Sequence, residues 1–599
     1  MSSKRNRKTL KEAVAPLSGS KPFRPLWAGL GVFVAAVAIR LLYIASIKGD
    51  PLFMTFILDS LVYDRWAAEI LKGDWLSRGM GLLNLSPGYA YWLALVYAVF
   101  GHSLLANALL QFLIGGLVSV LVFLLSLELC GDGIVALVCG ACYACYGPAV
   151  CYEAMPITAA WINMLNLSSL WILIRSRNCP SAGKSFAAGL LLGISYLFRP
   201  TVLLFGFCAV LLARRLFGPL ESVWAKCLAA FVIGLALPLG MFGMRNLAAA
   251  GKMAFTVNTG GINFFIGNNR HATGTYMHFQ DIESGNPLTQ VDDYRRAAGR
   301  IAHRELSVDE AGGFWRKQAV RYIFSNPGEW LSLEARKLLR FFSPYEGAQN
   351  VSYYYFLERS SLLRLCSFLS YSFLCAFGLI GMSLALSGGA HAADRFTAIV
   401  LSAYWLAYLA ACLLFFVTAE YRFAALPVVI VFMGAAFKAV RGWLRARSWS
   451  RSGCCAAAGV LLMLAFDLAD AETSRSLRNH ELSLAYTALG DALRQRGPAD
   501  EAIRSYERAI ELDPRSVLAR INLGAALIDL QRCEDALPLF EEVVRLAPVW
   551  QAYSNLGRCH YQARRFPDAV RDFERAYQLE PSPRNKSNLD AARQRSKLP

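Results

Sequence analysis

The stretch HSLLANALLQFLIGGLVSVLVFLLSLEL, residues 102–129, decides the fold class of this chain. Glu128 is the one Asp, Glu, Lys or Arg residue within it. A helix needs about 20 predominantly apolar residues to cross the hydrocarbon core of a bilayer, and this run is longer than that. The stretch therefore predicts a membrane-spanning helix in a fold that is mainly α.

Other apolar runs of similar length surround it. They occupy residues 26–47, 133–150, 157–174, 227–244, 362–386, 397–417, 423–440 and 453–468. The region 186–212 is apolar too, but Phe198-Arg199-Pro200 interrupts it, and basic residues flank it on both sides. Because loops rich in Lys and Arg stay in the cytoplasm, we expect a short hairpin there with Arg199 at its tip. The total is about 11 transmembrane helices.

The composition separates a membrane part from a soluble part. The chain has 599 residues, is 55% hydrophobic and has a mean hydropathy of +0.36, yet charge is dense from Glu472 onward. The net charge is +18, and the basic residues lie largely in short segments between apolar runs, including a basic cytoplasmic N-terminus at residues 1–25. No RNA- or DNA-binding motif accompanies this charge, so we expect no nucleic-acid partner.

The order of the apolar runs divides the chain ahead of residue 471 into three further parts. These are a transmembrane catalytic half at 26–244 with a first outer loop at 48–101, an extracytoplasmic loop domain at 245–358, and C-terminal transmembrane helices at 359–470. The loop domain is assigned to the outside because the positive loops on either side of it are expected in the cytoplasm.

A repeat of about 34 residues fills the C-terminal region. Gly490, Gly524 and Gly557 are separated by 34 and 33 positions. The same spacings recur in two further series, Ala502, Ala536, Ala569 and Pro514, Pro548, Pro581. Small residues in paired helices, closed by a proline, are the tetratricopeptide pattern. The sequence predicts an α-solenoid of three units over 482–581, with 582–599 as a tail or cap.

The side of the membrane on which the repeats lie depends on the apolar run at 453–468. If this run crosses the bilayer, the repeats are outside the cytoplasm, which is the expected arrangement. If its sixteen residues lie on the membrane surface instead, the repeats are cytoplasmic. Repeat grooves of this kind hold a peptide or a partner protein, so we expect such a partner here.

Several short segments resemble the GT-C superfamily of multi-pass glycosyltransferases. They are LDSLVYDRWAAEILKGDW (58–75), SPGYAYWLALVYAVFG (86–101), GPAVCYEAMPITAAWINMLNL (147–167), GLLLGISYLFRPT (189–201), RNLAAAGKMAFTVNTGGINFFIGNNRHATGTY (245–276) and EYRFAALPVV (420–429). In this order they are similar to protein O-mannosyltransferases and to the bacterial lipid A aminoarabinose transferase, and the resemblance covers roughly residues 26–440. The resemblance implies a bacterial inner-membrane hexosyltransferase that uses a sugar on polyprenyl phosphate and inverts the anomeric centre.

Asp59 matches the acidic residue of the family's first outer loop, and the resemblance implies that it is the general base. The alternative is a carboxylate that caps the helix expected at residues 60–71, since negative charge favours a helix N-terminus. Asp64 lies five residues further on and would face away from Asp59 on a helix. It is a candidate substrate-binding residue, and a pair with Arg65 or Lys72 is the other interpretation.

Glu153 in CYEAMP matches a second acidic position of the family, so we take it as a catalytic candidate. It could orient Asp59, hold the acceptor or bind a divalent metal ion, although no ligand pattern in the sequence requires a metal. The alternative is a solvated residue in a tight outer loop.

Three arginines are candidates for the lipid phosphate, namely Arg199, Arg245 and Arg422. The planar guanidinium matches a pair of phosphate oxygens, whereas the alternative is an interfacial side chain that reaches toward water. Asn268 lies in a segment rich in Gly and Asn, where exposed amides bind sugar hydroxyls or simply form turns. We take it as a substrate-binding candidate.

The leading prediction is a membrane enzyme that moves a sugar from polyprenyl phosphate to an acceptor hydroxyl, on protein or glycolipid, at the outer face. A catalytically inactive scaffold that presents the repeats is the alternative. A transporter of lipid-linked intermediates ranks third, because few ionisable residues lie in the middle of the apolar runs. The sequence lacks a glycine-rich phosphate loop and a dinucleotide fingerprint, which argues against a nucleotide-sugar donor.

Overall fold

The computed structural model describes residues 24–597 apart from 54, 57, 218–220, 277–288 and 389–393. All regular structure in these residues is helical, and they include no strand. The basic segment predicted for residues 1–25 lies almost wholly outside the described residues.

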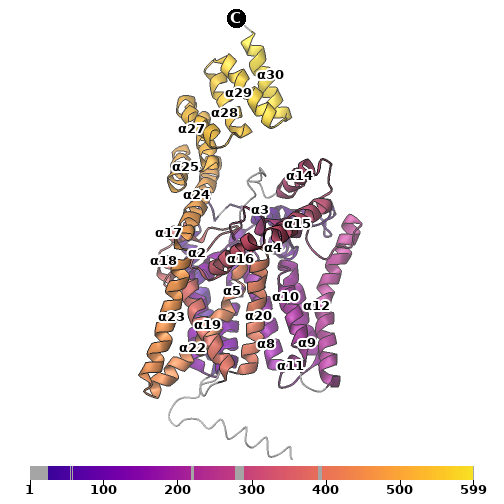
Figure 1. Cartoon of the computed structure of the whole chain (residues 1–599), viewed down its shortest axis with the longest axis vertical. Coiled ribbons are helices and arrows are strands. Elements are labelled where there is room, and N and C mark those ends of the chain that lie inside the picture. Colours follow the sequence, from indigo (N-terminus) through magenta and orange to yellow (C-terminus); the bar gives the residue numbers. More distant parts are fainter. Residues whose placement is uncertain are drawn as a thin grey trace, which may run out of the picture.

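Long apolar helices stand side by side and form a bundle (Figure 1). Their bounds are α2 Pro25–Ile47, α4 Gly88–Phe100, α5 Leu104–Cys130, α6 Gly133–Cys145, α7 Gly147–Ala154, α8 Ala159–Ser176, α9 Ala182–Phe198, α10 Val202–Leu211, α11 Ala213–Phe217, α12 Glu221–Ala250, α18 Ser361–Cys366, α19 Tyr371–Ser387, α20 Arg395–Leu414, α22 Leu426–Arg445 and α23 Trp449–Ala469. Within the described residues, 7 helices can cross a membrane by length and composition, or up to 8 if the bent pair of α6 and α7 is one span. The remaining difference from the predicted 11 lies in α8, α9 and α10, and that number stays a prediction.

The break predicted at Arg199 is present. Helix α9 ends at Phe198 and α10 begins at Val202, which leaves Arg199 at the junction. Helix α9 packs tightly on α12 through small residues: a Cβ at Gly189 would lie only 2.0 Å from a backbone oxygen of α12. Close approach of backbones is one way in which helices associate in membranes. Here it fixes α9, the helix that ends just before Arg199.

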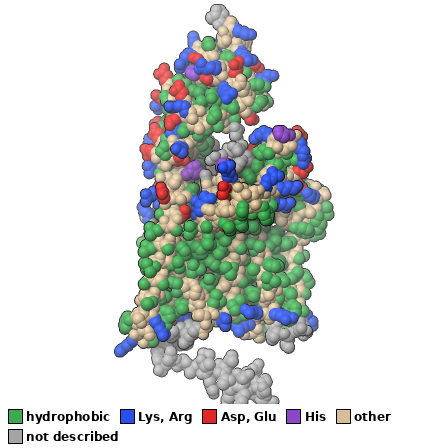
Figure 2. Space-filling model, viewed as in Figure 1, with side chains coloured by type: hydrophobic (Ala, Val, Ile, Leu, Met, Phe, Trp, Pro, Cys, Tyr) green, Lys and Arg blue, Asp and Glu red, His purple; other side chains and the backbone are tan. Residues whose placement is uncertain are grey.

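A second layer of helices covers one end of the bundle, which we call the α3 end. The bounds of this layer are α3 Asp59–Leu71, η1 Arg78–Met80, α13 Gly260–Gly267, α14 Gln290–Ala302, α15 Val308–Ser325, α16 Pro327–Phe342, α17 Tyr353–Arg359 and α21 Ala419–Arg422. Figure 2 shows a hydrophobic belt with Lys and Arg side chains along the opposite rim and mixed charges at the α3 end. The belt is the surface expected for contact with lipid, and the basic rim is the side expected in the cytoplasm.

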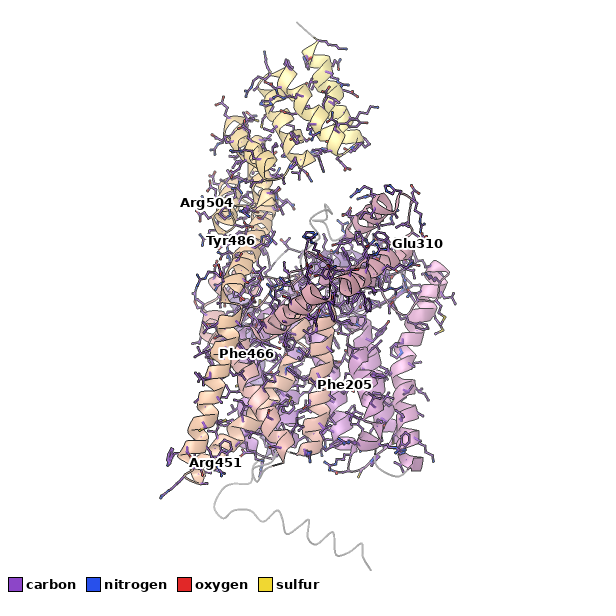
Figure 3. All side chains as sticks on the ribbon, viewed as in Figure 1. Phe205, Glu310, Arg451, Phe466, Tyr486 and Arg504 are labelled. Carbon is purple, nitrogen blue, oxygen red and sulfur yellow. The ribbon has the colours of Figure 1, made fainter. Side chains whose placement is uncertain are left out.

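Helix α23 connects the two ends. Arg451 near its start lies at the basic rim, whereas Tyr486 and Arg504 of the repeats lie beyond the α3 end (Figure 3). Phe466 near the end of α23 stacks on Phe342 of α16, with ring centres 4.7 Å apart. The repeats therefore stand at the same end of the bundle as α3.

The C-terminal region is a series of antiparallel helix pairs. The helices are α24 Ala471–Arg496, α25 Ala499–Leu512, α26 Val517–Asp529, α27 Cys533–Leu546, α28 Trp550–Gln562, α29 Phe566–Leu579 and α30 Pro583–Ser596. The three repeated glycines explain the packing of each pair. A Cβ at Gly490 would lie 2.4 Å from the ring of Tyr506, and Gly524 and Gly557 face Phe540 and Phe573 in the same way. Only a residue without a side chain leaves room for these rings.

Candidate active site

Asp59 is the first residue of α3, at the α3 end of the bundle. Asp59 lies in the first turn of the helix, where a negative charge is favourable, so the alternative weighed for it stays open. Asn350 holds the residue at two points: its Oδ1 accepts from the Asp59 backbone N–H at 3.2 Å, and its Nδ2 donates to Asp59 Oδ2 at 3.1 Å. Leu58, just before, has φ 50° and ψ −128°, a strained conformation for a branched residue and one that is typical of functional sites.

Glu420 of α21 completes a carboxylate pair. Its Oε1 accepts from the backbone N–H of Asn350 at 2.8 Å, and its Oε2 accepts from Asn350 Nδ2 at 3.0 Å. Asn350 is therefore hydrogen-bonded to Glu420 and to Asp59 at the same time, and both Asn350 and Glu420 are buried. One neutral side chain thus holds two carboxylates close to each other.

Arg199 brings a positive charge to this pair. Its Nη1 donates to the backbone oxygen of Glu420 at 2.8 Å, and its Nη2 lies 3.9 Å from Glu420 Oε2. The guanidinium carbon lies 4.4 Å from the centre of the Tyr421 ring, in the geometry of a cation–π contact. The side chain remains 15% exposed, so it can reach a ligand. We call Asp59, Asn350, Glu420 and Arg199 the Asp59 cluster.

The surroundings of Asp59 raise the pKa of its carboxyl to about 6. Burial has the largest effect, because it disfavours the charged form, and the negative charge of Glu420 acts in the same direction. The hydrogen bond from Asn350 and the positive charge of Arg199 lower the pKa and offset part of this increase. A carboxylate with a pKa near 6 is ionised at neutral pH and accepts a proton readily, as a general base must.

Glu153 lies elsewhere, and the expectation of a tight outer loop was wrong. The residue belongs to α7 and is 0% exposed. Its Oε2 pairs with Arg40 Nε at 2.5 Å, and its Oε1 accepts from the Tyr143 hydroxyl at 3.0 Å. Both carboxylate oxygens are thus engaged in a buried ion pair that joins α7 to α2 and α6. A catalytic role for Glu153 stays a prediction.

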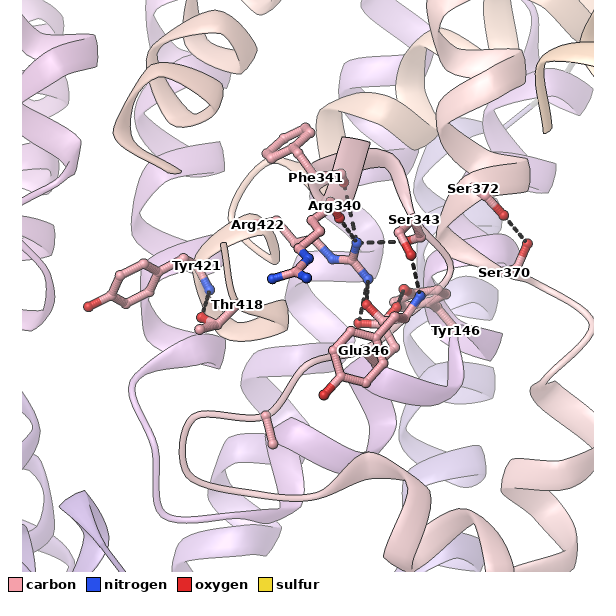
Figure 4. Close-up of polar contacts among 12 residues, drawn as sticks. Tyr146, Arg340, Phe341, Ser343, Glu346, Ser370, Ser372, Thr418, Tyr421 and Arg422 are labelled. Carbon is pink, nitrogen blue, oxygen red and sulfur yellow. Dashed lines mark hydrogen bonds and ion pairs between the residues drawn. The ribbon is translucent and has the colours of Figure 1, made fainter. Parts of the chain in front are cut away.

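Arg422 lies two positions after Glu420, and its side chain points toward Ser343 and Glu346, away from the ring of Tyr421 (Figure 4). Its Nη1 donates to the backbone oxygen of Ser343 at 2.7 Å and its Nη2 to that of Tyr345 at 2.6 Å. Glu346 Oε2 lies 3.2 Å from Nη2, and the side chain of Arg422 is 1% exposed. We call Arg422, Glu346 and the carbonyl groups around them the Arg422 cluster. In this arrangement the guanidinium holds the chain that follows α16.

Arg245 holds a loop in a similar manner. Its guanidinium donates to the backbone oxygens of Leu76 at 2.8 Å, Ser77 at 2.5 Å and Gly81 at 2.6 Å. These carbonyl groups belong to the loop that follows α3, so Arg245 connects α12 to that loop. The phosphate role predicted for this arginine stays a prediction.

Asn268 ends α13 and is buried. Its Nδ2 donates to the backbone oxygens of Phe264 at 3.0 Å and Leu414 at 2.9 Å. Its Oδ1 accepts from Trp330 Nε1 and from Lys337 Nζ, each at 3.2 Å. The amide is therefore fully hydrogen-bonded within the protein, as a helix-end residue that joins α13 to α16 and α20. Sugar binding by Asn268 stays a prediction.

Asp64 has partners on other helices. Its Oδ1 accepts from the Tyr97 hydroxyl at 2.8 Å and lies 2.6 Å from His102 Nε2. The predicted pair with Arg65 or Lys72 was therefore wrong, because the helix directs Asp64 toward the end of α4 rather than toward its own neighbours. Its substrate-binding role stays a prediction.

Two members of the Asp59 cluster were missed in the sequence. Glu420 is the first residue of EYRFAALPVV, a segment singled out only for Arg422, although an acidic residue before an apolar run was itself a signal. Asn350 lies in AQNVSYYYF, where no motif marks it.

The described residues contain no group of three or more His, Cys, Asp or Glu residues that could hold a metal ion. In the Asp59 cluster, an amide N–H donor of Asn350 lies between the two carboxylates, so these side chains as arranged do not form a metal-binding set. No step below involves a metal.

Comparison with known proteins confirms the tetratricopeptide repeats. The family model described as a tetratricopeptide repeat matches residues 521–585, and a second, described as a TPR repeat, matches residues 490–531. The Hsp70-Hsp90 organizing protein of Triticum aestivum is 34% identical over 96 residues, which are 16% of each chain. The STIP1 homolog of Dictyostelium discoideum is 30% identical over 84 residues, 14% of this chain and 15% of the relative. The match thus spans only about one sixth of these relatives.

Solved structures that are similar to this chain include an isolated repeat domain and a membrane protein. The first TPR of Spaghetti (RPAP3), bound to an HSP90 peptide, is 24% identical and covers 20% of this chain and 96% of its own, with a TM-score of 0.20. The oligosaccharyltransferase AglB from Archaeoglobus fulgidus is 14% identical and covers 80% of this chain and 59% of its own, with a TM-score of 0.36. At these TM-scores neither likeness supports a functional argument.

Proposed function

We propose that this chain is a membrane glycosyltransferase that moves a sugar from polyprenyl phosphate to an acceptor hydroxyl at the α3 end, with Asp59 as general base. The observation that carries the proposal is the Asp59 cluster itself: a carboxylate with a raised pKa, a second carboxylate, and a partly exposed guanidinium are held together at the boundary of a hydrophobic belt. These are the groups that such a transfer needs.

Asp59 takes the proton of the acceptor hydroxyl. As the acceptor oxygen forms its bond to the anomeric carbon, the bond from that carbon to the phosphate oxygen breaks, and the electron pair leaves with the polyprenyl phosphate. Attack from the face opposite to the leaving phosphate inverts the anomeric centre. A positioned general base of matched pKa contributes about 10²- to 10⁴-fold to such a step.

Arg199 stabilises the departing phosphate. Its guanidinium makes one short hydrogen bond, to a backbone oxygen, and two longer contacts from Nη2, to Thr158 Oγ1 at 3.5 Å and to Glu420 Oε2 at 3.9 Å. Donors therefore remain for phosphate oxygens, which arginine binds in pairs. Charge developing on the leaving oxygen is best stabilised by a group that is already in place, and the ring of Tyr421 keeps Arg199 in position.

Glu420 and Asn350 position the base. The charge of Glu420 contributes to the raised pKa of Asp59, and Asn350 fixes the direction of both carboxylates. Arg245, Arg422, Asn268 and Glu153 support the site at a distance, since their polar groups are engaged within the protein.

The basic rim is assigned to the cytoplasm and the α3 end to the outside of a bacterial inner membrane, in agreement with the positive-inside rule. The repeats are then periplasmic, and their groove takes a protein or peptide partner. Protease protection of a C-terminal tag in sealed vesicles of known orientation tests this assignment.

The test of the function is transfer from radiolabelled polyprenyl-phosphate hexoses, in membranes that contain the wild-type chain or the Asp59→Asn variant. We expect loss of donor turnover in the variant. The matched control is Glu69→Gln, which removes an exposed charge on the same helix, and it should retain turnover. If Asp59→Asn turns over donor like the wild type, the assignment fails.

A scaffold without catalysis is the second candidate, and the confirmed repeats favour it, because they alone would explain a protein-binding role. In that case the wild type would deplete none of the lipid-linked sugars, and a partner bound at the repeats would be unaffected by Asp59→Asn.

A further inference from the structure

The first repeat helix, α24, lies against the segment that carries Asn350. Its contacts recur along one face of the helix. They are Asp470 at its N-terminal boundary with Arg340 (3.5 Å), Ser474 with Ser343 (3.3 Å), Arg478 over the Tyr354 ring (4.4 Å) and Tyr486 with Glu358 (2.8 Å). The intervals of about one helical turn show that a single side of α24 follows residues 340–358. The repeats are thus packed onto the candidate site rather than merely attached to α23.

Glu481 is the central contact of this face. Its Oε2 accepts from the Tyr345 hydroxyl at 3.0 Å and from the backbone N–H of Ala348 at 3.1 Å. The residue is 8% exposed, and burial raises the pKa of its carboxyl to about 7, against the lowering effect of its hydrogen bonds. Burying a carboxylate is costly, so a neutral residue would suffice if α24 only had to cover this surface.

The segment that Glu481 holds is fixed on its opposite side by the Arg422 cluster. Arg422 donates to the backbone oxygen of Tyr345, while Glu481 accepts from the hydroxyl of the same residue. Ala348 lies two positions before Asn350. Asn350 is hydrogen-bonded to Asp59 and to Glu420, and it therefore links the two carboxylates. The backbone N–H groups of Tyr345 and Glu346 donate to the Ser343 hydroxyl at 3.2 Å and to the Tyr354 hydroxyl at 2.9 Å. Nearer to Asn350, the N–H of Ala348 donates to Glu481 and that of Asn350 to Glu420.

We propose that Glu481 is a positioning residue, which holds residues 345–350 in place so that Asn350 aligns Asp59 with Glu420. The first repeat helix is then a part of the active site, an assignment that rests on the function proposed above. A displacement of about 1 Å at a reacting group can cost about 100-fold in rate, so the loss of this one contact should be visible in turnover.

The experiment compares Glu481→Ala with Glu481→Gln in the full-length chain in lipid nanodiscs. Glutamine keeps an oxygen that accepts both hydrogen bonds, whereas alanine removes it. Hydrogen exchange of residues 345–350 is measured by mass spectrometry, together with kcat and KM for a radiolabelled polyprenyl-phosphate hexose. Glu472→Ala, which removes an exposed carboxylate from the same helix, is the matched control.

We expect Glu481→Ala to exchange faster in residues 345–350 and to lose about 10-fold or more in kcat with little change in KM. Glu481→Gln and Glu472→Ala should match the wild type in both readouts. If Glu481→Ala does not fold, Tyr345→Phe removes one of the two hydrogen bonds to Glu481 and leaves that from Ala348, so changes in the same direction but of smaller size are expected.

Three outcomes overturn the proposal. One is unchanged exchange in Glu481→Ala, another is faster exchange with wild-type kcat, and the third is an equal loss in Glu481→Gln. Failure of the proposed function is distinguishable, because it would appear as turnover that persists in Asp59→Asn, whereas the exchange measurement reports on the Glu481 contact without any catalysis.

Discussion

The Asp59 cluster and the Arg422 cluster lie on the two sides of α21, and their charged groups are used in different ways. Arg422 is 1% exposed and is surrounded by backbone oxygens and by Glu346. Arg199 is 15% exposed, makes one short hydrogen bond and keeps a carboxylate at 3.9 Å. A buried guanidinium whose Nη atoms donate to backbone oxygens and a carboxylate stabilises the fold, whereas a partly exposed one with few short hydrogen bonds is available for a ligand. We therefore expect mutations in the Asp59 cluster to lower activity with little effect on stability, and a mutation of Arg422 to lower stability.

The largest expected effect separates activity from stability. Asp59→Asn should lower kcat for sugar transfer by about 10²- to 10⁴-fold, because it removes the proposed base. Since the pKa of Asp59 is raised above its ordinary value, ionising it costs folding free energy as the pH rises from about 4 to about 6. The neutral variant avoids that cost, so its thermal unfolding temperature at pH 7.5 should equal or exceed that of the wild type. A variant that loses activity through unfolding would contradict this expectation.

The reverse result is expected on the other side of α21. Arg422→Met leaves Glu346 buried without its partner, and breaking a buried pair in this way costs about 3–5 kcal/mol. We expect a marked loss of thermal stability and of folded protein in detergent. Any protein that does fold should keep the KM for the donor but lose kcat, since Arg422 holds the Tyr345 carbonyl of the segment that carries Asn350 and has no direct hydrogen bond to Asp59. Wild-type stability together with a raised KM for the donor would show instead that Arg422 binds the phosphate.

A smaller effect should follow from Arg199→Lys. The variant keeps the charge but loses the paired donors of the guanidinium, so transfer should fall by about 10-fold, which is near the lower end of the roughly 1.5–3 kcal/mol of a charge-assisted hydrogen bond. Thermal stability should change by less than about 1 kcal/mol, because the side chain is partly exposed. Steady-state kinetics with the labelled donor measure the transfer rate, and thermal unfolding measures the stability. Unchanged kinetics would remove Arg199 from the proposed mechanism.

The sequence predicted those parts of the molecule that local pattern determines. The apolar runs and the 34-residue repeat depend on periodicity along the chain. The family models confirm the repeat, and in each unit a glycine packs against an aromatic ring at the corresponding position. The break at Arg199 followed from the charges on either side of it. Such features need no knowledge of what lies nearby in space.

The composition of the site could not be predicted in the same way. Asn350 lies 291 positions from Asp59 in the chain, so nothing in its own segment indicates the contact. Arg199 and Arg422 looked alike in sequence, since each borders an apolar run, and a single turn of helix decides which way Arg422 points. Asp64 was predicted to pair within its own helix, and it found Tyr97 and His102 instead.

The pH dependence of kcat/KM for sugar transfer tests the central claim most directly, because it reports the pKa of the base in the free enzyme. Wild-type activity should fall about tenfold per pH unit below an apparent pKa of about 6. Glu420→Gln removes a negative charge that raises this pKa, so the acid limb should move to lower pH. It should not move in His102→Gln, which excludes the nearby imidazole as its source. An acid limb that is absent between pH 5 and 7, or that stays in place in Glu420→Gln, would contradict the assignment of Asp59 as the base.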